Sequence, residues 1–535
     1  MEGRPGPESF FRYHRQPLKT VYLVCYALSA LCVRLPYLDY VVAAVIPALR
    51  PRRTWSMKRA FMVPLMRVGI APLVMVGFSA EQEPEDVMPT AKDEENGLVA
   101  LPPVEDRFIM GEVKEIAELN GVKAKRTFEY WYKSADVQGT GTHEAKDDEL
   151  VYLNFHGGGY CMETPKPSGM AVPPVCSGLL KHCSRISRII SPAYRLVSSH
   201  PFPTKNPFPA ALLDALAAYH YLLHTAGFRA ENVIVSGDSA GGHLAVALLR
   251  YLIISNLPEL PVPGALLLIS PTIEWALTHD LYGSSWWENQ AMDMSMPFLA
   301  SEYTARGLAG KLRADAIRRN AWIAPASRDL PQTEDLFVGF LRTLLVRGEA
   351  ETQRDAMRTF RDRLVGDVGE ENVTYKELTD VSHDVIGTPW DDEDKVLTFK
   401  MIGAWTQSLS IAHLSSTYRV DWVYTPRIVR RGAYSSCCDR DAASPRGTIR
   451  NKQGVVWRGF SEPQWRSYRP DSSQSGERDG GGGGGGWAPY CLPELGMSVG
   501  CQLCLHSAQD ALFGILSEAR HERRVEVSLR MQEEI

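Results

Sequence analysis

Between residues 126 and 412, short apolar runs alternate with longer segments in which apolar residues recur at helical spacing. This alternation is typical of β–α–β units, in which helices connect parallel strands. The short runs predict strands at 126–132, 149–155, 188–191, 232–236, 265–269, 342–346 and 372–377. The longer periods predict helices at 210–225, 240–254 and 351–364. We therefore expect an α/β fold with a mostly parallel central sheet that helices cover on both faces.

The first 80 residues are patterned differently, with apolar runs at 21–33 and 37–49. Each run has 13 residues, whereas a membrane-spanning helix needs about 20. Basic residues flank the two runs: Arg12, Arg15, Lys19, Arg50, Arg52, Arg53, Lys58 and Arg59. Residues 1–80 are therefore expected to be either an apolar cap over a site or a membrane-associating segment, with 18–59 against a membrane surface. The second case would place an intracellular protein at a membrane such as the endoplasmic reticulum.

Two further segments differ in composition from the α/β region at 125–414. Residues 81–124 begin with an acidic, proline-containing stretch, which predicts a linker and entry region. Residues 415–535 contain fifteen Arg, one Lys and a run of seven glycines at 480–486. This low-complexity composition predicts a disordered tail.

Composition excludes several classes of protein. The 535 residues are 44% hydrophobic and 23% charged, which is ordinary for a globular chain and excludes a wholly disordered or fibrous one. The net charge of −5 gives no general attraction to nucleic acid, so no nucleic-acid partner is expected. The ten cysteines show no spacing typical of a disulfide framework or a metal site, and no metal or other cofactor is expected.

A candidate nucleophile lies between the strand predicted at 232–236 and a long apolar helix. The residues there are Gly237, Asp238, Ser239, Ala240 and Gly241. A G-x-S-x-G sequence in this position forms a sharp turn that lifts the serine hydroxyl above the sheet, and glycine is needed where side chains would collide. Ser239 is therefore the candidate nucleophile. The Ala240 amide, at the start of the helix, is a candidate donor to an oxyanion.

A second glycine motif, His156-Gly157-Gly158-Gly159, directly follows the strand predicted at 149–155. Glycines allow the backbone to approach a substrate closely, so that amides can donate where negative charge develops. We expect the amides of Gly158 and Gly159 to form an oxyanion hole with that of Ala240. His156 is expected to shape this loop rather than to act as a base.

These motifs together resemble a known family. HGGG at 156–159, Tyr-Arg-Leu at 194–196, PFPAALLDALAAYHYL at 207–222 and GDSAGG at 237–242 are similar to the hormone-sensitive-lipase branch of the α/β-hydrolases, especially its fungal fold-3 proteins. The resemblance covers roughly residues 125–410 and implies an α/β-hydrolase catalytic domain. It also implies a catalytic triad in the chain order serine, acid, histidine.

The resemblance assigns the two partners of Ser239. His383 follows the last predicted strand in a segment similar to the family's His-Asp-Phe loop, and is expected to be the base. In the family, the acid comes three residues after a glycine that ends the penultimate strand, which selects Glu351 after Gly348. The residues after Glu351 depart from the family pattern, so Glu349 and Asp355 remain alternatives.

The insertion at 275–330 is rich in aromatic residues and methionine. These residues are expected either to line an acyl pocket or simply to pack in a cap or in the core. They are Trp275, Trp286, Trp287, Met292, Met294, Met296, Phe298 and Tyr303.

The expected reaction is hydrolysis of a carboxylic ester of a small molecule or lipid, with Ser239 as nucleophile, His383 as base and Glu351 orienting the imidazole. An acyltransferase and a lipid or sterol-ester deacetylase would use the same triad. A non-catalytic ligand-binding protein of the same fold is a further alternative, although such proteins typically lack a triad residue. Spacing along the chain does not reveal the acyl length or the alcohol part.

Overall fold

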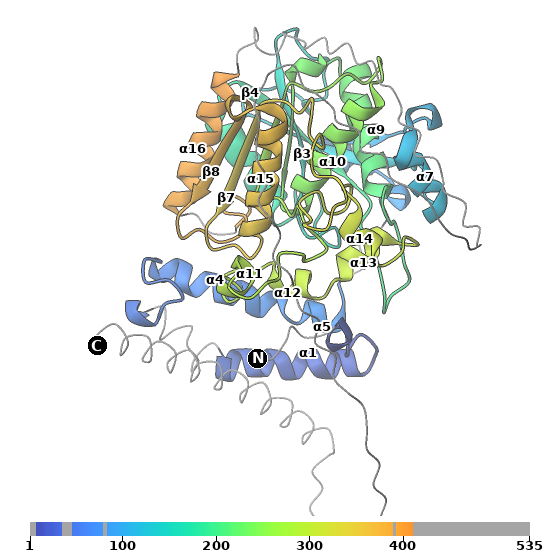
Figure 1. Cartoon of the computed structure of the whole chain (residues 1–535). Helices are drawn as coiled ribbons and strands as arrows, with labels where there is room; N and C mark the ends of the chain where they lie inside the picture. Colours follow the sequence, from blue (N-terminus) through green and yellow to red (C-terminus); the bar gives the residue numbers. More distant parts are fainter. Residues whose placement is uncertain (1–6, 35–44, 79–82, 389–391, 410–535) are drawn as a thin grey trace, which may run out of the picture. The chain divides into compact units, whose positions relative to one another are not determined.

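The computed structural model describes residues 7–34, 45–78, 83–388 and 392–409 (Figure 1). The predicted tail at 415–535 and part of the second N-terminal apolar run lie outside these residues. The described part of the chain is built around one eight-stranded sheet with the strand order β1-β2-β4-β3-β5-β6-β7-β8.

The strands are β1 (Leu98–Leu101), β2 (Thr127–Lys133), β3 (Leu150–Phe155), β4 (Ile186–Ala193), β5 (Val233–Asp238), β6 (Ala265–Ile269), β7 (Thr343–Gly348) and β8 (Val373–Leu378). Strand β2 pairs antiparallel with β1 and with β4, and all other pairs are parallel. The predicted α/β fold with a mostly parallel sheet is therefore confirmed. All seven predicted strands are present, with shifts of one or two residues at most ends.

Strand β1 was not predicted, and it lies within residues 81–124, for which the sequence predicts an acidic linker and entry region. Leu98 and Leu101 are buried, and Leu98 pairs with Tyr130 of β2. The preceding helix α6 (Ala91–Glu95) is closed by a capping box between Thr90 and Asp93. A four-residue strand within an acidic segment is too short to give a clear alternation, so only its pairing with β2 defines it.

Helices cover both faces of the sheet, as predicted (Figure 1). On one face lie α9 (Ala210–His224), α10 (Ala240–Ser255) and α15 (Arg354–Val368), and on the other α8 (Val172–His182) and α16 (Glu393–Ser408). Alternate residues of β3 point into the two layers: Leu153 contributes to the first core and Tyr152 to the second. Helix α15 begins at Arg354, three residues later than predicted, which leaves Glu351 in the loop before it.

The insertion after β6 forms α11 (Ser285–Glu288), α12 (Met296–Ala300), α13 (Tyr303–Ala309) and α14 (Ala316–Arg319). These short helices lie beyond the carboxyl ends of the parallel strands (Figure 1). The other short elements are η4 (Pro84–Asp86), η5 (Asp106–Phe108), α7 (Gly111–Asn120), η6 (Ala230–Asn232) and η7 (Glu370–Asn372).

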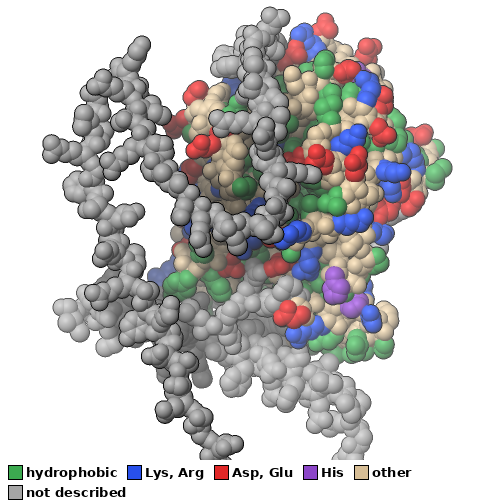
Figure 2. Space-filling view, turned by 45° about the vertical axis from the view of Figure 1, so that its right-hand side comes forward, with side chains coloured by type: hydrophobic (Ala, Val, Ile, Leu, Met, Phe, Trp, Pro, Cys, Tyr) green, Lys and Arg blue, Asp and Glu red, His purple; other side chains and the backbone are tan. Residues whose placement is uncertain are grey.

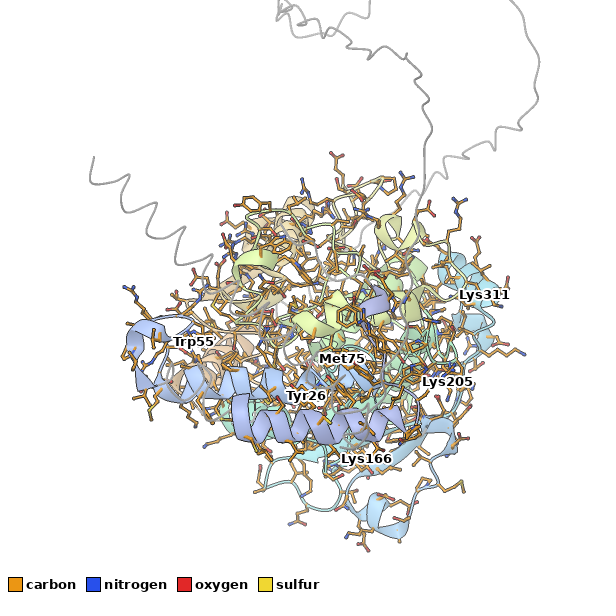
Figure 3. All side chains as sticks on the ribbon, turned by 90° about the horizontal axis from the view of Figure 1, so that it is seen from below. Tyr26, Trp55, Met75, Lys166, Lys205 and Lys311 are labelled. Carbon is orange, nitrogen blue, oxygen red and sulfur yellow. The ribbon has the colours of Figure 1, made fainter. Side chains whose placement is uncertain are left out.

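The N-terminal segment lies against the same end of the domain. It comprises η1 (Pro7–Ser9), α1 (Leu18–Ser29), η2 (Ala30–Arg34), η3 (Pro47–Leu49), α4 (Met57–Ile70) and α5 (Leu73–Val76). Seen from below, α1 and α4 run side by side across this end (Figure 3). By length and composition alone, residues Met57–Val76 would suffice to cross a membrane, although 39% of that apolar window is buried against the protein. This stretch follows the two apolar runs noted in the sequence.

Candidate active site

Ser239 occupies a strained turn between β5 and α10. Its backbone angles are φ 50° and ψ −116°, a conformation that non-glycine residues rarely adopt. A Cβ atom at Gly237 would lie 2.4 Å from the Gly241 carbonyl, and one at Gly241 would lie 2.0 Å from the Phe155 oxygen. Side chains at these two positions would therefore prevent the turn, as the motif predicts.

The loops that follow β7 and β8 bring Glu351 and His383 to this serine. The His383 Nε2 atom lies 2.9 Å from the Ser239 hydroxyl, and His383 Nδ1 lies 2.8 Å from Glu351 Oε2. All three side chains are buried, with Glu351 wholly inaccessible to solvent. The structure thus brings together three residues separated by 112 and 32 positions in one hydrogen-bonded chain.

The surroundings of His383 favour its protonated form. Burial lowers the pKa of the imidazole, but the hydrogen bond and charge of Glu351, with smaller contributions from Asp293 and Asp384, outweigh burial and raise the pKa to about 9. The site therefore stabilises the imidazolium that forms when this histidine accepts a proton.

Ser270 is a site residue that the sequence analysis missed. It lies at the end of β6 with φ 44°, and its hydroxyl donates to Glu351 Oε1 at 2.7 Å. The Ser270 hydroxyl oxygen also accepts a hydrogen bond from the Asp384 amide at 3.1 Å. Ser270 thus links the acid loop to the histidine loop. The available signal was its position directly after a predicted strand of the parallel sheet, where sites of such folds are built.

Gly348 contributes an amide donor, and its lack of a side chain allows two loops to pack closely. Its amide donates to Glu351 Oε1, so this oxygen receives two hydrogen bonds while Oε2 faces His383. A Cβ atom at Gly348 would lie 2.0 Å from the Val381 carbonyl oxygen. The glycine therefore allows the acid loop to pack directly against the histidine loop.

The two alternative acids, Glu349 and Asp355, are hydrogen bonded to groups other than His383. Glu349 accepts hydrogen bonds from Arg52 at 3.3 Å and from the Asp380 amide at 3.1 Å. Asp355 accepts from the Ser285 amide at 2.8 Å, at the start of α11. Of the three candidate carboxylates, Glu351 is the one hydrogen bonded to His383.

The glycine loop after β3 lies against the nucleophile turn. Gly158 and Gly159 have φ angles of 83° and 61°, and a Cβ atom at Gly157 would lie 3.3 Å from that of Ser239. His156 Nδ1 donates to the Gly157 carbonyl at 3.0 Å, and its ring stacks on Tyr194. Burial lowers the pKa of His156 to about 4, so it is neutral and holds the loop by hydrogen bonding and stacking.

Asp238 lies on the inner side of the same loop. One of its carboxylate oxygens would be 2.3 Å from a Cβ atom at Gly157. Burial, and next the negative charge of Asp384, raise the pKa of Asp238 well above its usual value. Asp238 therefore fills the space behind the glycine loop as a carboxyl group that resists ionisation.

Most of the aromatic and methionine residues of the insertion pack in hydrophobic clusters. Trp275 and Trp286 belong to the main core, and Met292 packs near Trp55. A cavity of about 230 Å³ adjoins the glycine loop, where His156 and Tyr194 line it. Of the eight residues considered for an acyl pocket, Tyr303 lines this cavity.

The N-terminal segment contacts both loops of the site. Arg52 Nη1 lies 2.7 Å from Asp380 Oδ1, three residues before His383, and Nη2 donates to Asn289 at 3.2 Å. The Asn289 amide in turn donates to the Glu351 carbonyl at 2.9 Å. Trp55 is buried against Ala350, and its indole donates to the Asp380 carbonyl at 2.6 Å.

Within the described residues, no group of three or more His, Cys, Asp or Glu side chains is arranged to hold a metal ion. The hydrogen-bonded chain of serine, histidine and carboxylate can carry out nucleophilic chemistry with the protein's own groups.

Part of the chain is similar to known proteins. A sequence model described as the alpha/beta hydrolase fold matches residues 152–387. An acetyl-hydrolase of Streptomyces hygroscopicus is 28% identical over 239 residues, which are 45% of this chain and 69% of the relative. An esterase of Acinetobacter venetianus is 30% identical over 164 residues, which are 31% of this chain and 48% of the relative.

Among solved structures, a hormone-sensitive-lipase homologue from a metagenome library aligns with 51% of this chain and 81% of its own at 27% identity and a TM-score of 0.39. The chain spans about two thirds of the length of the Streptomyces acetyl-hydrolase and about half of the length of the Acinetobacter esterase. From the family match and the observed sheet, residues 152–387 form an α/β-hydrolase domain, and the names of the relatives that match it, an acetyl-hydrolase and an esterase, support a carboxylic ester hydrolase.

Proposed function

We propose that this protein is a serine hydrolase that cleaves carboxylic esters through Ser239, His383 and Glu351. The observation that carries the proposal is the continuous hydrogen-bonded chain from the Ser239 hydroxyl through both nitrogens of His383 to the buried Glu351 carboxylate. In the first step, Ser239 Oγ attacks the ester carbonyl while His383 Nε2 takes the hydroxyl proton. The imidazolium then gives this proton to the leaving alcohol.

Water completes the cycle. After the alcohol departs, His383 deprotonates a water molecule, which attacks the acyl-serine, and the proton returns to Ser239 as the acid is released. Glu351 holds the proton of the neutral imidazole on Nδ1, so that Nε2 is free to accept one. It also stabilises the imidazolium.

The oxyanion of each tetrahedral intermediate is bound by backbone amides. We assign this role to Gly158, Gly159 and Ala240, because the glycine loop lies against the Ser239 turn and Ala240 begins α10. Each such donor lowers the activation barrier by about 3 kcal/mol.

The substrate class that we propose is a small-molecule or lipid ester. The name of the Streptomyces relative suggests acetyl esters as the first compounds to test. A lipid ester is favoured by the exposed apolar side chains of the N-terminal segment, which also support the proposal that residues 18–59 contact a membrane surface.

The decisive test replaces Ser239 with alanine in the full chain. We expect Ser239→Ala to abolish turnover of p-nitrophenyl esters and labelling by a fluorophosphonate. The matched control is Ser236→Ala, a buried serine three residues earlier whose hydroxyl binds Asn154, and it should retain both properties. If the Ser239→Ala protein still hydrolysed the ester, the proposal would have to be abandoned. Acyl products formed with an added alcohol would instead identify an acyltransferase.

A further inference from the structure

Helix α1, with the short η2 turn that continues it, carries an apolar stripe on the side that faces away from the protein. Leu18, Val21, Val24, Leu28 and Leu31 follow one another at intervals of three or four residues, so they share one side of the helix. Their exposed fractions range from 48% for Val21 to 64% for Leu31. In a soluble surface helix this side would be polar.

The opposite side of α1 binds the protein. The Tyr26 hydroxyl donates to the Val68 carbonyl of α4 at 2.8 Å, and the Tyr22 ring stacks on Tyr13 at 4.4 Å. Just before the helix, the Phe11 amide donates to the Val74 carbonyl of α5 at 2.8 Å. The Tyr13 amide likewise donates to the Met75 carbonyl of α5 at 3.0 Å, and Figure 3 shows α1 crossing this end of the molecule beside α4. The protein-facing contacts therefore keep the aliphatic stripe pointing outward.

Exposed apolar side chains also occur outside α1. Further large apolar side chains with high exposure lie before α4 and at its first residue: Val45, Ile46, Leu49 and Met57. A contiguous apolar stripe such as that on α1 is rare on soluble monomers and marks a contact with a partner or a lipid phase. Another face of the domain shows the ordinary pattern, with side chains of both charges interspersed (Figure 2).

Charge indicates which partner this surface fits. The sequence from residue 8 to residue 78 has ten Lys and Arg against Glu8 and Asp39, although the whole chain has a net charge of −5. Among these basic residues, Arg12, Arg15 and Arg53 are exposed. Aliphatic side chains bordered by basic residues match the interface of an anionic bilayer, where hydrocarbon lies just below acidic headgroups.

Helix α4 has a different role, although it is the longer apolar stretch. Arg59 forms an ion pair with Asp392 at 2.8 Å, and Arg67 donates to the Asp293 carbonyl at 2.6 Å. These contacts would be lost if α4 crossed a bilayer. Helix α4 therefore belongs to the surface of the hydrolase, and α1 is the element placed to meet lipid.

We propose that α1 lies in the plane of an anionic phospholipid surface, with its stripe from Leu18 to Leu31 among the acyl chains and the neighbouring basic residues at the headgroups. Since α1 lies at the end of the domain where the insertion helices and the carboxyl ends of the strands meet (Figure 1), this seating turns the Ser239 end of the sheet toward the membrane. The consequence for substrates rests on the proposed ester hydrolysis: the preferred substrates are then esters that partition into the bilayer.

The test uses the full chain with vesicles of phosphatidylcholine alone or with phosphatidylserine. We expect sedimentation with the phosphatidylserine vesicles, and at least tenfold weaker binding for the double variant Val24→Asp and Leu28→Asp. The matched control is Ile254→Asp with Leu397→Asp, which alters two equally exposed side chains on α10 and α16 and should bind like the parent. Replacing Arg12 and Arg15 with glutamine should weaken binding about fivefold for each charge removed.

Turnover of a water-soluble p-nitrophenyl ester separates this inference from the proposed reaction. The α1 variant should keep that turnover while losing activity toward an ester embedded in vesicles. Equal vesicle binding by the α1 and control variants would overturn the inference. So would a dimer of the parent protein that the α1 substitutions convert to a monomer, because a second copy would then be the partner of this surface. Turnover retained by Ser239→Ala together with intact vesicle binding would overturn the proposed reaction and leave the placement of α1 on the membrane standing.

Discussion

Replacing Glu351 with glutamine tests the proposed triad most directly, because the structure predicts how the new amide will lie. Glu351 Oε1 accepts hydrogen bonds from the Ser270 hydroxyl and the Gly348 amide. In a Glu351→Gln protein the amide oxygen should keep this place, since an NH₂ group would face two donors there. The NH₂ group would then face His383 Nδ1.

That orientation places the imidazole in the wrong tautomer. A donor opposite Nδ1 requires this nitrogen to accept, so the proton moves to Nε2, which can then no longer take the Ser239 proton. We expect kcat to fall by on the order of 10⁴-fold, as for the corresponding change in serine proteases. The fold should survive, because the glutamine side chain keeps the volume of the glutamate and both hydrogen bonds of the Oε1 side.

The same change should alter the pH profile. In the parent protein the pKa of His383 is raised to about 9 against the opposing effect of burial, and Glu351 is the principal cause of the increase. Activity that needs neutral His383 should therefore rise with pH up to about 9. Without the carboxylate, the effect of burial dominates the pKa of His383. The acidic side of the pH–activity profile should therefore move to lower pH by at least about one unit.

The assay is kcat/KM for p-nitrophenyl acetate from pH 6 to pH 10, with Glu349→Gln and Asp355→Asn as controls. Both controls should retain activity within about tenfold, because these carboxylates bind Arg52 and the Ser285 amide instead of His383. A Glu351→Gln protein as active as the controls, or an acidic side of the profile that did not move, would refute the assignment of Glu351. A larger loss in Asp355→Asn would point to the alternative acid.

Further predictions concern the groups around the triad. Ser270→Ala should lower kcat about tenfold to a hundredfold with little change in KM, because Glu351 and the Asp384 amide both lose a partner; unchanged kinetics would remove Ser270 from the site. Arg52→Ala should lower kcat/KM about tenfold, since Arg52 binds Asp380 and Asn289, whereas the exposed neighbour Arg53→Ala should be neutral; equal effects would contradict this. Gly241→Ala should destabilise the protein by more than about 2 kcal/mol in urea unfolding, because its Cβ atom would lie 2.0 Å from the Phe155 oxygen; a stable variant would show that the turn can relax. Since the folded pKa of His383 lies above 6.5, its contribution to stability should be complete below pH 6.5 and lost as pH rises to about 9; a His383→Asn protein should lack this part of the pH dependence of unfolding.

The N-terminal contacts also change how membrane binding should be tested. Deleting residues 1–60 would remove the apolar helix α1, but it would also remove Arg52 and Trp55, which contact the histidine loop through Asp380. Loss of activity after such a deletion would therefore not by itself indicate a membrane role. Substitutions confined to the outward side of α1 avoid this ambiguity.

Features that depend on a few consecutive residues could be predicted from the sequence alone. The turn at Ser239 requires glycines at fixed offsets, and the strand and helix beside it are long, apolar and regular. The glycine loop after β3 is equally local. For the same reason the seven longer strands were predicted, whereas the four-residue β1 was recognisable only through its pairing with β2.

Tertiary structure decided which side chains meet. Glu349, Glu351 and Asp355 are all acidic and close together in sequence. Their roles separate because the loop after β7 buries Glu351 against His383 and turns Glu349 toward Arg52, while the first turn of α15 places Asp355 against Ser285. The position of Ser270 directly after a predicted strand was visible in the sequence, but its bond to Glu351 depends on β6 lying beside β7. The contacts of Arg52 span 328 positions of the chain to Asp380, and no local pattern encodes a contact of that kind, because it depends on how the whole chain packs.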